Sequence, residues 1–384
     1  MRLAIFQTTS LAILLCLSAG VKAADVTVGT AHAGIGQKAT GYLEVPAGVD
    51  AATNLPVIVI NGAKAGPTLA LIAGVHGTEY ASSLALAQLA ARVEPSELAG
   101  TLVILPLLNV ASYLQKIVHI NPIDQKRVGG YPGKADGTQS ERIAYAVYHQ
   151  VIEKCDHLID YHGGDLDENL HPYSYWTNTG KPDLDKMSRE MLFAFGLRTI
   201  IIKQPSASLD STALKLGKAS ITVEAGRAGT SDPADIGVLI DGTLNVMRYL
   251  KMLDGPATMS VQHPLWISKL TIVKGEQEGI FYPSIVPEAY VHEGMTVGYI
   301  TDYFGNKIAD VTAPVTGVIT HVCSVPTMKK GDNVVYIGEI GDDPAAPRAD
   351  RRPRRSGHRV RPCDGISAAV LQRSQGRCDP KSDG

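Results

Sequence analysis

Two side chains that could bind a metal ion, His76 and Glu79, lie three residues apart in the segment GVHGTE, residues 74–79. The apolar run before it, residues 68–73, predicts a buried strand, and the Ala- and Leu-rich stretch after it predicts a helix. The two glycines permit a tight turn between strand and helix. Such a turn places the imidazole and the carboxylate on one side, where Zn²⁺ takes nitrogen and oxygen ligands at about 2.0–2.2 Å. The tetrapeptide alone is weak evidence, because Glu is favoured in the first turn of any helix.

His162 occupies the same kind of position at the end of another strand. It follows the apolar run HLIDY, residues 157–161, and precedes two glycines. We therefore predict that His162 is the third metal ligand rather than a histidine satisfied within the core. Asp160 or a backbone carbonyl is expected to orient its ring.

A carboxylate, Glu224, ends a third apolar strand, ITVE, and runs into Ala-Gly-Arg227. A carboxylate in this position needs a partner, because its burial is otherwise costly. One interpretation is a structural salt bridge with Arg227. The other is a general base that acts on water at the metal. Three protein ligands with an open fourth position are typical of catalytic rather than structural zinc.

Most of the other histidines among the 11 in the chain have ordinary explanations. His119 and His171 fall in polar loops, where an imidazole faces solvent more often than it lines a cleft. The cysteines are sparse and lack C-x-x-C spacing, so neither a thiolate zinc site nor a dense disulfide framework is indicated. Any metal is therefore expected to be held by histidine and carboxylate.

Length and composition exclude several classes of protein. The chain has 384 residues, 45% of them hydrophobic, which suffices for one large core and a smaller one. The formal net charge of −2 gives no case for nucleic acid or an anionic membrane surface as a partner.

The two ends of the chain differ from the rest in composition. Residues 1–23 fit a signal peptide, with an apolar run at 11–17 and cleavage after Ala23, so we predict a secreted or periplasmic protein. That run is shorter than the about 20 residues that cross a membrane, and no later segment is long enough. Residues 342–384 are rich in arginine, with seven between Arg348 and Arg361, and are predicted to be a disordered tail.

Strand-like and helix-like runs alternate between residues 24 and 255, which predicts an α/β domain: a mixed sheet with helices on both faces. Ligands of such sheets bind beyond the carboxyl ends of the strands. From 256 to 341, short apolar runs between Gly, Pro and Asp turns predict a small all-β domain. The predicted strands of the first domain are 56–61, 68–73, 101–107, 157–161, 199–202 and 221–224, and its helices are 79–93, 139–153, 184–195 and 233–250.

The motifs GVHGTE, DYHGG and TVEAG, in this order and before an all-β region, resemble the succinylglutamate desuccinylase/aspartoacylase family of zinc hydrolases, which share the metallocarboxypeptidase fold. The resemblance covers residues 54–340. It implies that His76, Glu79 and His162 bind one Zn²⁺ per chain and that Glu224 is the base and proton shuttle. It also implies that Asn109 lies near the cleft, although a turn role would explain this residue equally well.

One segment departs from the family pattern. Members carry Asn-Leu-Asn-Arg before Tyr/Phe-Pro-Gly, and the Asn-Arg pair binds the substrate carboxylate. Residues 124–133 read DQKRVGGYPG instead, one residue short. Arg127 is the nearest replacement, because arginine is the natural bidentate partner of a carboxylate, and Arg227 is a further candidate for substrate binding. The departure predicts weaker substrate binding and impaired activity, and it leaves the zinc ligands in place.

We therefore predict a secreted zinc hydrolase that cleaves the amide bond of an N-acyl amino acid or a similar small substrate with a carboxylate. The first alternative is a zinc carboxypeptidase that acts on periplasmic peptides through the same site. The second is a zinc-binding homologue with impaired catalysis, which the altered segment favours and the presence of Glu224 opposes.

Overall fold

The computed structural model describes residues 24–345, and residues up to Gly341 form one compact unit. The predicted signal peptide, residues 1–23, and almost all of the predicted tail lie outside the described residues. Within the described range, no helix is long and apolar enough to span a membrane.

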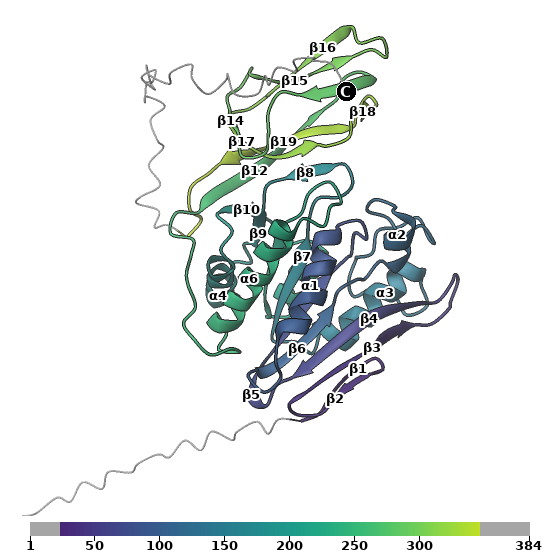
Figure 1. Ribbon diagram of the computed structural model, residues 1–384, viewed down its shortest axis with the longest axis vertical. Helices are drawn as coiled ribbons and strands as arrows, with labels where there is room; N and C mark the ends of the chain where they lie inside the picture. Colours follow the sequence, from purple (N-terminus) through teal and green to yellow (C-terminus); the bar gives the residue numbers. More distant parts are fainter. Residues whose placement is uncertain (1–23, 346–384) are drawn as a thin grey trace, which may run out of the picture. The chain divides into compact units, whose positions relative to one another are not determined.

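A large mixed sheet forms the centre of the fold (Figure 1), in the order β14-β17-β19-β12-β10-β9-β11-β7-β5-β6-β4-β3. The strands up to residue 224 are β1 (Val26–Val28), β2 (Ala31–Ala33), β3 (Gln37–Val45), β4 (Thr53–Asn61), β5 (Lys64–Ala73), β6 (Ala99–Leu105), β7 (His157–His162), β8 (Glu168–Leu170), β9 (Tyr173–Thr177), β10 (Thr199–Lys203) and β11 (Ala219–Glu224). The helices are α1 (Tyr80–Arg92), α2 (Val110–Gln115), α3 (Gln139–Val147), the π-helical turn η1 (Tyr148–Ile152), α4 (Pro182–Phe195), α5 (Leu209–Lys215) and α6 (Pro233–Tyr249).

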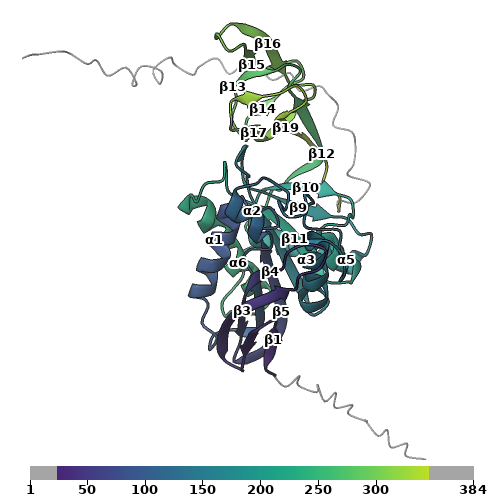
Figure 2. The same ribbon diagram turned by 90° about the vertical axis from the view of Figure 1, so that its right-hand side faces the viewer.

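Helices cover both faces of this sheet, as predicted (Figure 2). Successive residues of a strand point to opposite faces, and β5 shows this directly. Leu69 and Leu71 pack into the core beneath α1, α4 and α6, whereas Ala70 and Ile72 pack into the core on the side of α3 and α5. The continuous apolar run of β5 thus reflects burial on both faces.

The central strands bring the predicted site residues to one edge of the sheet. Strand β5 is parallel to β6 and β7, and β7 is parallel to β11, so the carboxyl ends of these strands lie together. In the β7–β11 register, His162 is the partner of Glu224. His76 lies beyond the end of β5, in the turn that leads into α1.

The C-terminal β region continues the main sheet. Strand β12 pairs with β10 in parallel and with β19 in antiparallel orientation, while β8 pairs with β17. A four-stranded sheet in the order β16-β15-β13-β18 completes the region. The division into two domains near residue 256 stays a prediction. The strands are β12 (Leu265–Lys274), β13 (Gly279–Pro283), β14 (Tyr290–Val291), β15 (Thr296–Thr301), β16 (Lys307–Thr312), β17 (Gly317–Cys323), β18 (Thr327–Met328) and β19 (Asn333–Ile340).

All the strands and helices predicted for the α/β region are present, with small shifts at their ends. The helix predicted over 139–153 is α3 continued by the π-helical turn η1, and Thr138 and Glu141 form a capping box at its start. Sequence reasoning missed β3, whose residues are mostly exposed or half-exposed at the edge of the sheet. Such a strand lacks the buried apolar pattern on which the prediction depended.

Candidate metal centre and active site

The three predicted metal ligands converge in space. Nδ1 of His76 lies 2.6 Å from Oε1 of Glu79, and Nδ1 of His162 lies 3.0 Å from Oε2 of the same carboxylate. The turn that carries His76 depends on two glycines. A Cβ on Gly74 would lie 2.9 Å from Cα of Leu107, and one on Gly77 would lie 2.4 Å from the backbone nitrogen of Tyr113. Only glycine fits this close approach of backbones.

The arrangement fits a bound Zn²⁺. Tetrahedral zinc with bonds of about 2.0–2.1 Å separates its ligand atoms by about 3.3 Å, which is longer than the 2.6 and 3.0 Å above by less than 1 Å. Glu79 is buried, and its Oε2 accepts no well-aligned hydrogen bond despite the nearby imidazole. Burial raises the pKa of Glu79, but the two imidazoles outweigh it and lower the pKa to about 2. The carboxylate is therefore ionised and ready to bind a cation.

Asp160 holds the outer side of His162. Its Oδ1 lies 3.4 Å from Nε2 of His162, and the residue is buried within β7. The sequence offered Asp160 or a backbone carbonyl as the group that orients the His162 ring. The structure places the carboxylate of Asp160 beside that ring. A carboxylate that contacts the far nitrogen of the imidazole fixes the ring orientation and directs Nδ1 toward the ligand site.

Glu224 lies beside His162 at the end of β11 and is almost completely buried. Burial raises the pKa of Glu224 well above its usual value, and the nearby imidazole of His162 only partly offsets this. The alternative of a structural salt bridge with Arg227 is wrong. That guanidinium instead donates to both oxygens of Asp235, at 2.9 and 2.7 Å. Among the described residues, Glu224 has no ion pair or side-chain hydrogen bond.

The predicted substrate-binding residues lie in different surroundings. Asn109 is buried as the N-cap of α2, where its Oδ1 accepts a hydrogen bond from the backbone of Ser112 at 3.2 Å. Arg127 is exposed, and its guanidinium makes no ion pair or hydrogen bond within residues 24–345. Burial raises the pKa of Tyr336, and the charge of Arg127 opposes this rise. The roles of Asn109, Arg127 and Arg227 stay predictions.

Three residues that sequence reasoning did not assign to the site lie against the ligand group. Nε2 of His119 lies 2.8 Å from Oδ2 of Asp165, and its ring centroid lies 4.7 Å from that of His76. Glu168 follows, with Oε1 at 4.0 Å from the same nitrogen. The sequence favoured solvent over a cleft for His119, but the structure places its imidazole against the carboxylate of Asp165. The acidic residues that closely follow His162 in HGGDLDE were the one available signal.

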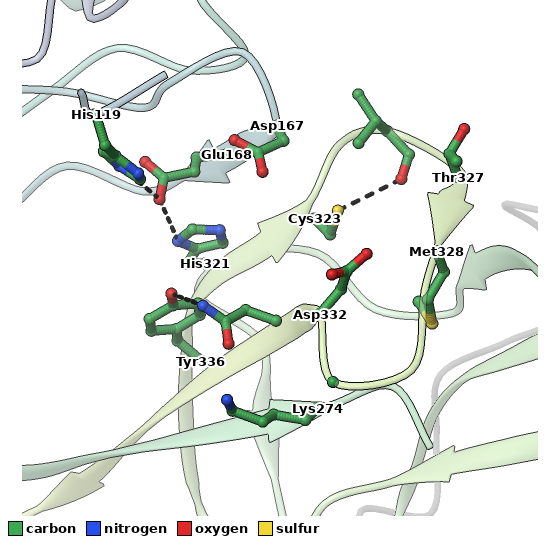
Figure 3. Close-up of a pocket in the computed structure, with 13 residues that line it drawn as sticks. His119, Asp167, Glu168, Lys274, His321, Cys323, Thr327, Met328, Asp332 and Tyr336 are labelled. Carbon is green, nitrogen blue, oxygen red and sulfur yellow. Dashed lines mark hydrogen bonds and ion pairs between the residues drawn. The ribbon is translucent and has the colours of Figure 1, made fainter. Parts of the chain in front are cut away.

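A cavity of about 410 Å³ adjoins this cluster. Figure 3 shows Glu168 between His119 and His321 on its wall. The cavity is lined by loops of the α/β region and by strands of the C-terminal β region. His119 and Glu168 lie on its wall and also belong to the cluster of potential metal ligands. Its lining residues are His119, Asp167, Glu168, Lys274, His321, Cys323, Val325, Thr327, Met328, Gly331, Asp332, Asn333 and Tyr336.

Comparison with known proteins identifies a related family. Residues 65–250 match the family model of the succinylglutamate desuccinylase/aspartoacylase catalytic domain. The chain is 23% identical over 313 residues to N-alpha-acetyl-L-2,4-diaminobutyric acid deacetylase of Halomonas elongata, covering 78% of this chain and 91% of the relative.

Two solved structures share the fold. A succinylglutamate desuccinylase/aspartoacylase from Rhodobacter sphaeroides superposes with a TM-score of 0.72 at 22% identity, over 80% of this chain and 96% of that one. The product-bound ectoine utilization protein EutE (DoeB) from Ruegeria pomeroyi gives 0.72 at 24% identity, over 78% and 95%.

Proposed function

Since residues 65–250 belong to the succinylglutamate desuccinylase/aspartoacylase family, we propose that the chain is a zinc-dependent hydrolase of N-acylated amino acids. The observation that carries this proposal is the pairing of two groups at one sheet edge. One is the ligand set His76, Glu79 and His162, and the other is the buried carboxylate of Glu224, which has no structural partner within residues 24–345. A site that only binds metal has no need of the second.

The residues of the chain divide the chemistry between them. Zn²⁺ held by His76, Glu79 and His162 supplies a Lewis acid for the amide carbonyl. Glu224 accepts a proton from the attacking water while the water oxygen forms a bond to the carbonyl carbon. It then donates that proton to the amine nitrogen as the carbon–nitrogen bond breaks. The products are a carboxylic acid and a free amino acid. The buried position of Glu224, which raises its pKa, suits a group that must take up and return one proton.

The charges around the cavity point to a substrate with both a carboxylate and a cationic group. Lys274 lines the cavity, so its ammonium supplies positive charge for a carboxylate. Asp167 and Asp332 also line the cavity, and Oδ1 of Asp167 is buried without a hydrogen-bond partner. An ammonium group would satisfy that oxygen. The deacetylase of Halomonas elongata is named for a substrate of this kind, an acetylated diamino acid.

Two further parts of the proposal rest on the sequence. The segment 1–23 supports secretion or a periplasmic location, and the missing Asn-Leu-Asn-Arg element supports weak binding of acidic substrates. A carboxypeptidase would use the same metal and base, so the substrate must be tested directly.

The test is a parallel assay of zinc-loaded protein with four substrates: an N-acetyl diamino acid, N-acetylaspartate, N-succinylglutamate and a short peptide with a free carboxyl end. We expect release of the free amino acid, fastest from the diamino acid. Hydrolysis of the peptide alone would show that the chain is a carboxypeptidase. No hydrolysis of any substrate by protein with full zinc content would overturn the proposal in favour of a metal-binding protein.

A further inference from the structure

His119 lies between the proposed metal ligands and the cavity. Its ring centroid is 4.7 Å from that of His76, and its imidazole lies on the cavity wall (Figure 3). The side chain is 28% exposed. Its Nε2 lies against Asp165 and Glu168, whereas its Nδ1 makes no ion pair or hydrogen bond within residues 24–345. One nitrogen of this ring can therefore contact a molecule in the cavity.

A buried carboxylate fixes the position of this imidazole. Asp165 is completely buried, and its Oδ2 lies 2.8 Å from Nε2 of His119. The hydroxyl of Thr78 donates to the other oxygen of the same carboxylate. Thr78 belongs to the turn GVHGTE, between His76 and Glu79. Asp165 therefore connects His119 to the turn that carries two of the proposed metal ligands.

The same ion pair makes the imidazole a hydrogen-bond donor at both nitrogens. A buried carboxylate is costly unless a positive charge pairs with it. Within residues 24–345, the ion pair of Asp165 is with His119, so an imidazolium balances the carboxylate. An imidazolium carries hydrogen on Nδ1 as well as on Nε2. The Nδ1–H group is thus a donor without an acceptor in the described part of the chain.

The loop that carries His119 is anchored on both sides. The backbone nitrogen of Ile117 donates to the carbonyl of Ser112 at 3.1 Å. Asn121 is completely buried, and its Nδ2 donates to Oε1 of Gln139 at 2.8 Å. His119 itself has φ of 61°, in a region that residues other than glycine rarely occupy and that often marks active sites. A donor held in place before the substrate binds is the condition for strong electrostatic stabilisation of a reaction.

His119 and the proposed base lie beside different metal ligands. Glu224 is the register partner of His162, whereas His119 packs against His76. The ring centroids of His76 and His162 are 5.0 Å apart. The base can therefore act on the attacking water while His119 contacts another atom of the scissile group.

We propose that His119 is a further catalytic residue of the hydrolase, an inference that rests on the proposed function. Its Nδ1–H donates a hydrogen bond to the carbonyl oxygen of the scissile amide. As the water oxygen bonds to the carbonyl carbon, one electron pair of the C=O double bond moves to this oxygen, and the imidazolium stabilises the negative charge. The pair returns to the double bond when the carbon–nitrogen bond breaks. His119 transfers no proton in these steps, so Glu224 remains the group that does.

The first test compares wild type and His119→Ala with the fastest of the four substrates above, with the zinc content of both measured. We expect equal zinc content, little change in KM and a fall in kcat of about 10²–10³-fold, the effect of losing one such donor. His119→Arg restores a cationic donor and should recover part of the loss. The matched control is His171→Ala, a loop histidine with a side chain 33% exposed, which should behave like wild type.

The second test does not depend on turnover. It measures, by calorimetry, binding of a methylphosphonamidate analogue of the N-acetyl diamino acid, in which phosphorus replaces the carbonyl carbon. We expect the affinity of His119→Ala for this tetrahedral analogue to fall in parallel with kcat/KM, while the affinity for the free diamino acid stays unchanged. A purely structural role of His119 would not separate the two affinities.

Several results would overturn the role of His119. They are a fall in kcat of less than about tenfold, loss of zinc from His119→Ala, or equal weakening of analogue and free amino acid. If His119→Ala fails to fold, His119→Gln decides by the same measurements, because it keeps a polar side chain beside Asp165 but carries no charge. A wild type that hydrolyses no substrate would overturn the proposed function, and this role with it. An active wild type with an equally active His119→Ala would overturn the role of His119 alone.

Discussion

Replacement of Glu224 by Gln tests the proposed base most directly. The amide preserves the shape of the side chain but can no longer accept and return the proton. Within residues 24–345, the carboxylate makes no ion pair or side-chain hydrogen bond that the substitution would break, so the effect should be confined to the reaction. General acid–base catalysis contributes about 10²–10⁴-fold, which corresponds to about 2.7–5.5 kcal/mol in the barrier.

The assay compares kcat of wild type and Glu224→Gln at saturating zinc, with the metal content of both measured in the same samples. We expect equal zinc content, a fall in kcat of about 10²–10⁴-fold and a melting temperature no lower than that of the wild type. The last expectation follows from burial, which disfavours the ionised carboxylate and thereby raises its pKa. Replacement of the exposed Glu97 by Gln is the control and should change none of the three values.

Two results would refute this reasoning. A fall in kcat smaller than about tenfold would mean that another group takes the proton, because it lies well below the range for general acid–base catalysis. Loss of zinc from the variant would mean that Glu224 is a metal ligand, and the division of roles between it and Glu79 would be wrong.

Three further outcomes follow from named contacts. Asp160→Ala removes the carboxylate behind His162, and we expect zinc affinity, measured by chelator competition, to fall about 10–100-fold; unchanged affinity would remove Asp160 from the site. Arg127→Ala should lower kcat/KM for substrates with a carboxylate about 10- to 150-fold, the equivalent of a charge-assisted hydrogen bond, and wild-type kinetics would show that the residue only faces solvent. Asp210→Ala should cost about 1.5–3 kcal/mol in urea unfolding at pH 7, because it removes the buried carboxylate that accepts a charge-assisted hydrogen bond from the partly buried ammonium of Lys203. Burial raises the pKa of Asp210, but the ammonium of Lys203 outweighs it and holds this pKa below its usual range. The paired carboxylate therefore contributes stability above about pH 4, and the difference between the two proteins should shrink as the pH falls below that value; a difference independent of pH would contradict the pairing.

The local sequence was sufficient to predict the proposed zinc ligands His76, Glu79 and His162. Apolar runs that end at small residues fix where β5, β7 and β11 stop, and these runs are readable without any knowledge of the rest of the chain. The structure places β5, β7 and β11 parallel and adjacent, so their carboxyl ends meet at one edge of the sheet and bring His76, Glu79, His162 and Glu224 together.

The sequence also indicated the α/β class of the first part of the chain and the β-rich character of the last part. It did not indicate that the two share one sheet. That continuity depends on β12, which pairs with β10 on one side and β19 on the other. Strand pairing between segments more than 60 residues apart leaves no periodic pattern in either segment.

Only the tertiary structure decided the surroundings of the ligand set. It placed His119 and Asp165 beside His76, turned Arg227 toward Asp235 rather than Glu224, and set Asn109 as a helix cap. These residues lie in loops, which have no hydrophobic period and whose course is fixed by the elements they pack against. The position of a loop side chain is a consequence of packing between distant parts of the chain, and for that reason its chemistry becomes visible only after the chain has folded.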